Sequence, residues 1–217
     1  LLMGLTSLAL ADNIQLKRGA ARLNVKVTED TYQKVMYKEE GRDHPIPIAP
    51  ENVEWIEYDD APREFGDGRN AFEIGDYENA VSFFKEALEL AKTSGVGEWL
   101  QNYAYFYLAQ SYKKWGETTS FDAQKYQDSI QFYQKTLQVA PNSRFIFACY
   151  LQMAQCYLAG KNYTAAKEQL HNLQTLAKEQ TKDPQWLFFV ALWQGHVAVA
   201  EGNYSNAVVR YKDAETV

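Results

Sequence analysis

The chain has 217 residues, of which 46% are hydrophobic and 23% are charged, and its formal net charge at pH 7 is −6. This composition is typical of a soluble globular protein that buries one large core or two small ones. Nucleic-acid-binding proteins usually carry a stripe of Lys and Arg, and the acidic balance without such a run argues against that class. The longest apolar stretch, WLFFVALW from Trp186, is interrupted at Gln194, so we expect no stable membrane span.

The first eleven residues, LLMGLTSLALA, are apolar and end in the small-x-small sequence Ala9-Leu10-Ala11 before the polar Asp12. This pattern is typical of the end of a secretory signal peptide whose charged start is missing. Residues 1–11 therefore predict an extracytoplasmic protein, periplasmic or secreted, in a bacterial cell. The alternative is that this segment forms the first helix or strand of the fold.

Residues 12–60 alternate apolar and polar positions in short runs, as in RLNVKVT and NVEWIEY, and glycine or proline separates the runs. A period of two with such short spacers predicts four or five antiparallel strands and leaves no room for a helix between them. We expect a small β-sheet or barrel module, which packs on the following residues because a sheet of this size is marginally stable alone.

The pattern changes near Pro62, and helical periodicity continues from there, so we place residues 61–217 in a helical domain. Four segments start a helix with tyrosine and continue with side chains three, seven and ten residues later on one helix face. These segments begin at Tyr77, Tyr126, Tyr163 and Tyr204. A second pattern precedes the turns, clearest in YFYLAQSY and YLQMAQCY. Each unit is predicted to be two helices joined by a short turn, with small residues that let the two backbones approach closely.

This arrangement resembles the tetratricopeptide repeat, a helix-turn-helix unit of about 34 residues. The small residues of the first and second helices stand where that family keeps small residues: Ala109, Ala154, Gly195, Ala80, Ala166 and Ala207. The resemblance implies a mainly α fold, an α-solenoid of about four repeats, which the small antiparallel β domain makes α+β overall. Equivalent positions lie further apart than one such repeat, which predicts insertions. Without a polar capping helix before Val217, we expect the array to be truncated at its C-terminus.

The resemblance implies a non-catalytic scaffold in which the first helices line a concave groove. The family's groove positions fall on Phe65, Arg69, Phe72, Tyr103, Phe106, Gln110, Lys113, Leu151, Gln155, Leu158, Phe189, Leu192 and His196. One subgroup of the family binds the C-terminal carboxylate of a peptide with Lys, Arg and Asn at these groove positions. Here the groove positions are largely apolar or Gln, so we do not expect that activity. We expect an apolar groove that binds a peptide or helix of a partner protein. The alternative is a structural unit whose repeats mediate self-association, and the groove itself is open to cover by the β module, a further helix or a second copy.

Catalytic and metal-ligating patterns are missing from the sequence. The histidines, His44, His171 and His196, have no partners at metal-ligand spacing. Cys149 and Cys156 are seven residues apart on one predicted helix, about 10 Å along its axis, which is too far for a disulfide. We therefore expect no enzyme activity, no metal and no cofactor.

Overall fold

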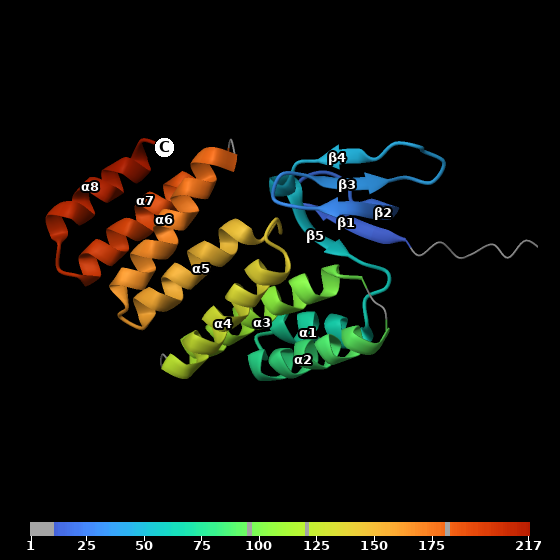
Figure 1. Cartoon of the computed structure of the whole chain (residues 1–217), viewed down its shortest axis with the longest axis horizontal. Coiled ribbons are helices and arrows are strands. Elements are labelled where there is room, and N and C mark those ends of the chain that lie inside the picture. Colours follow the sequence, from blue (N-terminus) through green and yellow to red (C-terminus); the bar gives the residue numbers. More distant parts are fainter. Residues whose placement is uncertain (1–10, 95–96, 120–121, 181–182) are drawn as a thin grey trace, which may run out of the picture. The chain divides into compact units, whose positions relative to one another are not determined.

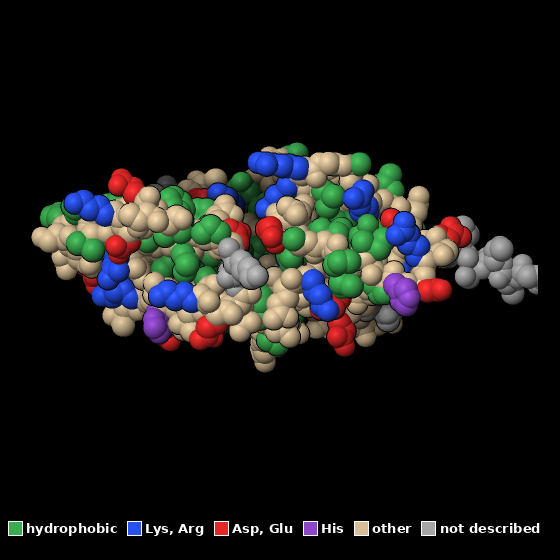
Figure 2. Space-filling view, turned by 90° about the horizontal axis from the view of Figure 1, so that it is seen from above, with side chains coloured by type: hydrophobic (Ala, Val, Ile, Leu, Met, Phe, Trp, Pro, Cys, Tyr) green, Lys and Arg blue, Asp and Glu red, His purple; other side chains and the backbone are tan. Residues whose placement is uncertain are grey.

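The computed structural model describes residues 11–94, 97–119, 122–180 and 183–217, and the chain divides into one compact unit up to Pro62 and another from Arg63 (Figure 1). Apart from Ala11, the signal-like segment 1–11 lies outside the described residues. Figure 2 shows acidic and basic side chains interspersed with hydrophobic ones on the visible face, without a continuous basic surface there.

The first unit is a five-stranded antiparallel sheet with the strand order β4-β3-β2-β1-β5. Its strands are β1 (Asp12–Leu16), β2 (Arg22–Asp30), β3 (Val35–Lys38), β4 (Ile46–Ile48) and β5 (Val53–Glu57), with a short 3₁₀ turn at Pro50–Asn52. The apolar side chains that alternate along these strands form the core, among them Ile14, Val25, Val35 and Ile56. The expected small antiparallel β domain is confirmed.

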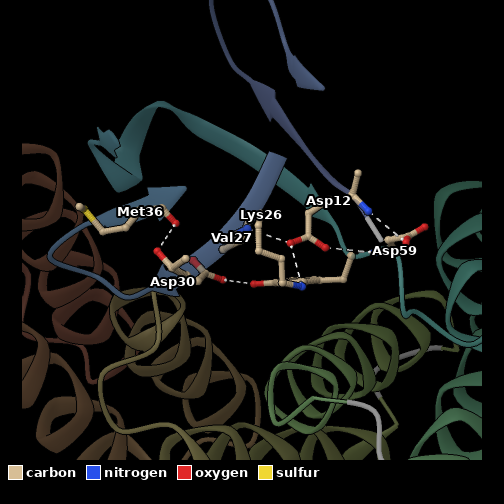
Figure 3. A network of polar contacts seen from close by, with 9 residues as sticks. Asp12, Lys26, Val27, Asp30, Met36 and Asp59 are labelled. Carbon is tan, nitrogen blue, oxygen red and sulfur yellow. Dashed lines mark hydrogen bonds and ion pairs between the residues drawn. The ribbon is translucent and has the colours of Figure 1, made fainter. Parts of the chain in front are cut away.

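A buried carboxylate ties the sheet together at Asp12 (Figure 3). One of its oxygens, Oδ2, accepts a hydrogen bond from the Val27 backbone N–H at 2.8 Å and lies 3.5 Å from the Lys26 ammonium. The other, Oδ1, accepts from the Asp59 backbone N–H at 3.2 Å. The carboxylate of Asp59 in turn accepts from the Ala11 N–H at 3.1 Å. Because these bonds join β1 to β2 and to the chain that leaves β5, Asp12 fixes three segments at once.

The second unit, Arg63–Val217, is helical throughout the residues that the structure describes. Its helices are α1 (Arg63–Glu73), α2 (Tyr77–Ser94), α3 (Trp99–Thr118), α4 (Ala123–Val139), α5 (Ile146–Ala159), α6 (Tyr163–Gln180), α7 (Gln185–Ala200) and α8 (Tyr204–Glu215). Each odd-numbered helix packs on the next as a hairpin, and successive hairpins pack on one another (Figure 1). The first helices of neighbouring hairpins also meet, α1 with α3 and α5 with α7. The predicted solenoid of helical hairpins is confirmed.

The repeated turn has one construction in three of the hairpins. The residue two positions before the leading tyrosine has a positive φ: +81° at Gly75, 59° at Lys161 and +76° at Gly202. This left-handed conformation ends the first helix, and glycine adopts it without strain. The next residue, Asp or Asn, accepts a backbone hydrogen bond from the first turn of the second helix, as Asn203 Oδ1 does from the Asn206 N–H at 3.1 Å.

Small residues bring the two helices of a hairpin close together, as the sequence predicts. A Cβ atom at Gly195 would lie 2.4 Å from Cε1 of Tyr211 in α8, and one at Gly68 would lie 2.9 Å from the ring of Phe84 in α2. The repeats are longer than the family's usual unit partly because α2 and α3 are long, 18 and 20 residues. Close packing of the hairpins therefore depends on residue size at a few fixed positions.

Candidate functional site

The first helices α1, α3, α5 and α7 carry the thirteen residues predicted to line the groove. Five of them are buried in the structure: Phe65, Tyr103, Phe106, Lys113 and Leu151. The other eight are half-buried: Arg69, Phe72, Gln110, Gln155, Leu158, Phe189, Leu192 and His196. We call these eight residues the inner surface. The side chains of the inner surface are partly accessible to solvent, whereas the five buried residues pack within the protein.

The link between α4 and α5 explains why Phe106 and Tyr103 are buried. Phe145 stacks on Phe106 with ring centroids 4.1 Å apart and an angle of 6° between the planes, and it meets Tyr103 edge-on at 4.8 Å. The guanidinium of Arg144 covers Phe145 at 4.8 Å and donates from Nε to Tyr103 Oη at 3.2 Å. The apolar surface that we expected at Phe106 is thus covered by Phe145, a residue of the link between α4 and α5. Phe145 lies outside the repeated sequence pattern, so the pattern does not predict this contact.

Four inner-surface residues occupy the same place in the four hairpins, directly after the small residue of each first helix: Arg69, Gln110, Gln155 and His196. The two outer members of this set interact within the protein. Arg69 pairs with Glu73 at 3.1 Å, and its guanidinium lies 5.9 Å from the ring centroid of Tyr107. His196 Nδ1 lies 3.1 Å from Tyr211 Oη, within hydrogen-bond distance.

The two central members, Gln110 and Gln155, differ from the outer ones. Within the described parts of the chain, neither amide makes a side-chain hydrogen bond, although both side chains are half-buried. A half-buried amide offers one acceptor and two donors, which match the backbone groups of an extended or helical peptide.

Lys113 is buried and forms an ion pair along α3 with Glu117 at 2.8 Å, where Lys114 also pairs at 3.0 Å. Burial favours the neutral form of Glu117, but the hydrogen bonds from the two ammonium groups outweigh it and hold the pKa of Glu117 below its usual value. This predicted groove residue therefore stabilises the helix that carries it.

The two cysteine thiols are held in unreactive surroundings. Both cysteines are free and buried, and burial raises the pKa of the Cys156 thiol to about 11 and that of Cys149 further still. Among the residues that the structure describes, no cluster of His, Cys, Asp or Glu has the makings of a metal site. In the same residues, no helix combines the length and apolar character needed to cross a membrane.

The geometry defines an array of stacked helical hairpins, which is the α-solenoid class of repeat protein. Family models described as tetratricopeptide repeat match residues 68–94, 103–143 and 148–177. The helical unit belongs to the tetratricopeptide repeat family, and these repeats indicate a protein-interaction scaffold. The hairpin of α7 and α8 follows the matched residues and has Ala198 where the α3 and α5 hairpins have tyrosine.

Among solved structures, the chain is similar to the crystal structure of BtubC (BKLC) from P. vanneervenii, with 18% sequence identity and a TM-score of 0.57. The match covers 70% of this chain and 61% of that one, so this chain spans less than two thirds of the length of its structural relative. At this identity the likeness shows the fold alone. The comparison with curated proteins gives no match.

Proposed function

We propose that the repeat unit is a non-catalytic scaffold whose inner surface binds a peptide or helix of a partner protein. The observation that supports this most directly is the pair Gln110 and Gln155, two half-buried amides at equivalent places in successive hairpins. They act as fixed polar contacts for the backbone of the bound segment. Phe72, Leu158 and Leu192 supply apolar contact on either side.

The expected affinity follows from the area that such a segment buries. About 400 Å² of buried apolar surface contributes roughly 10 kcal/mol before costs, and the loss of translational and side-chain freedom offsets most of it. Binding in the micromolar range, about −8 kcal/mol, is the natural outcome. Such an affinity suits reversible recruitment of a partner.

The test compares two matched pairs of substitutions in affinity capture from the native source, read by quantitative mass spectrometry. Gln110→Glu with Gln155→Glu places two charges on the inner surface without changing side-chain size. Gln131→Glu with Gln134→Glu places the same charges on the exposed face of α4. We expect the wild type and the α4 variant to recover the same partner protein in similar amounts. We expect the inner-surface variant to recover at least tenfold less of it. Equal recovery by both variants would contradict the proposal.

We propose further that the protein works outside the cytoplasm of a bacterium, which the signal-like residues 1–11 support. N-terminal sequencing of the protein from its native source tests this. Removal of the segment by a signal peptidase leaves Asp12 as the first residue. A native protein that keeps residues 1–11, recovered with cytoplasmic markers, would count against it.

Self-association is a second candidate, which the last hairpin favours. Three apolar side chains of α8 are largely exposed: Tyr204 at 67%, Val208 at 53% and Val209 at 51%. An exposed apolar helix face of this kind is typical of a surface that another helix covers. Light scattering over a range of concentrations separates the two candidates. A mass that grows with concentration in the wild type, and stays monomeric after Val208→Lys with Val209→Lys, would favour self-association.

A further inference from the structure

A second concave site lies between α2, α3 and α4, and none of its residues belongs to the inner surface. It offers a volume of about 280 Å³. Its lining comprises Lys85, Leu88, Glu89, Lys92, Gln101, Tyr105, Phe132 and Lys135. This volume is just below the range of about 300–1,000 Å³ for small-molecule sites, so it accommodates one or two side chains.

The charge of this site is positive, although the whole chain is acidic. Three lysines and one glutamate line it, which gives a net charge of +2. The glutamate is already neutralised, because Glu89 Oε1 lies 2.6 Å from Lys92 Nζ. In the described parts of the chain, neither Lys85 nor Lys135 forms an ion pair with a carboxylate. Two ammonium groups on opposite walls, one on α2 and one on α4, are therefore available to an anion.

Aromatic rings hold both ammonium groups in place. Lys85 Nζ donates to Tyr112 Oη at 2.8 Å, and Lys135 Nζ lies 4.7 Å from the ring centroid of Phe132. The rings form a stack, since Phe132 is nearly parallel to Tyr112 at 5.5 Å and lies 6.1 Å from Tyr105. Ammonium groups over aromatic faces are attracted by the ring electrons, which orients them without neutralising their charge.

We propose that this site binds an acidic segment of a partner protein, with one apolar side chain against Leu88 and Tyr105 and carboxylates on Lys85 and Lys135. A peptide with two carboxylates matches the charge of the lining. A nucleic acid fits less well, because the chain carries a net charge of −6. The amide of Gln101 at the edge of the site can bond to the peptide backbone. This site acts independently of the inner surface.

The experiment is an NMR titration of the whole chain with two blocked pentapeptides. The first has a central phenylalanine with one acidic residue on each side of it and glycine at both ends, and the second has the corresponding amides in place of the two acids. At a salt concentration of about 50 mM, where charges are little screened, we expect the acidic peptide to shift resonances around the site. We expect the amide peptide to bind at least fivefold more weakly.

Variants locate the binding. Lys85→Gln with Lys135→Gln is expected to weaken the acidic peptide about five- to tenfold, since each exposed ion pair contributes up to about fivefold. Lys85→Arg with Lys135→Arg keeps the charge and is expected to retain binding within about twofold, which separates charge from packing. The control, Lys178→Gln with Lys212→Gln, removes two exposed lysines from α6 and α8.

Three results would overturn the proposal. The amide peptide binding as tightly as the acidic one would remove the role of charge. Equal loss of affinity in the site variant and the α6–α8 control would show that only net charge matters. Single-stranded oligothymidylate shifting the same resonances at lower concentration than the peptide would assign the site to nucleic acid. Loss of partner capture through the inner surface does not change any of these readouts, so the two proposals fail separately.

Discussion

Gly195→Ala tests the close approach of α7 and α8 in the last hairpin. The new methyl carbon would lie 2.4 Å from Cε1 and 2.7 Å from Cδ1 of Tyr211. The ring can move away only by giving up its contact with His196, where Oη and Nδ1 are 3.1 Å apart. Overpacking of this kind costs about 1–3 kcal/mol, while replacing a helical glycine by alanine gains about 1 kcal/mol. Because the contact is so short, we expect a net loss of about 1–2 kcal/mol of unfolding free energy.

The assay is thermal unfolding followed by circular dichroism, in which this loss corresponds to a fall in Tm of about 3–6 °C for a chain of this size. Gly66→Ala is the matched control, because Gly66 lies in α1 and no atom comes within 4 Å of the place that its new methyl group would take. The control is expected to gain up to about 1 kcal/mol. The double variant Gly195→Ala with Tyr211→Leu is expected to recover most of the loss. Stabilisation by Gly195→Ala equal to that of the control would refute the close packing.

Single contacts elsewhere in the chain give four more expected outcomes. Asp12→Asn removes the buried charge that accepts from the Val27 and Asp59 N–H groups and is expected to cost about 2 kcal/mol, seen as roughly 30-fold faster amide exchange in β1 and β2. Gly202→Ala strains a turn with φ of +76° and is expected to cost about 1 kcal/mol in urea unfolding. Cys149 and Cys156 are expected to resist a thiol reagent at about pH 8 while the protein is folded, because burial raises the pKa of both thiols. Glu117→Gln is expected to cost less than about 1 kcal/mol at pH 7, and the difference from wild type disappears as the pH falls through the lowered pKa of Glu117.

Each of these has a control and a contrary result. Asp43→Asn, in an exposed loop, is expected to leave amide exchange unchanged, and an equal effect at both aspartates would contradict the role of Asp12 in joining the strands. Lys161→Gly relieves a strained φ of 59° and is expected to stabilise, so a loss there would contradict the role of the left-handed turn. In urea, where the protein is unfolded, both thiols are expected to react rapidly. Equally rapid reaction in the native protein would contradict their burial. Glu179→Gln, at an exposed position, should show no such pH dependence.

The sequence predicts the architecture well because the repeated features are local. Alternation over a few residues identifies the strands, and the turn before Tyr163 or Tyr204 needs only a left-handed residue and an Asn. Small residues at fixed offsets likewise identify the contacts within hairpins, as Gly195 does with Tyr211. Each of these signals lies within a single hairpin, so a short segment of sequence is enough to predict the contact.

The binding surfaces are harder to predict because they depend on contacts between distant segments. Position in a helix marks Phe106 as a groove residue, but Phe145 stacks on it from the link that follows the next helix. The stack of Tyr105 on Phe132 likewise joins two helices, and only their packing creates the site beside Lys135. Asp12 shows the same limit in the β unit, since its partners lie 15 and 47 residues away.

Site-specific photo-crosslinking tests the proposed function most directly. A photoreactive amino acid at position 155, on the inner surface, is compared with the same amino acid at position 131, on the exposed face of α4. Irradiation in the native source is expected to join one partner protein to position 155, and introducing Gln110→Glu in the same chain is expected to remove that product. A partner joined equally to both positions, or only to position 131, would contradict binding on the inner surface.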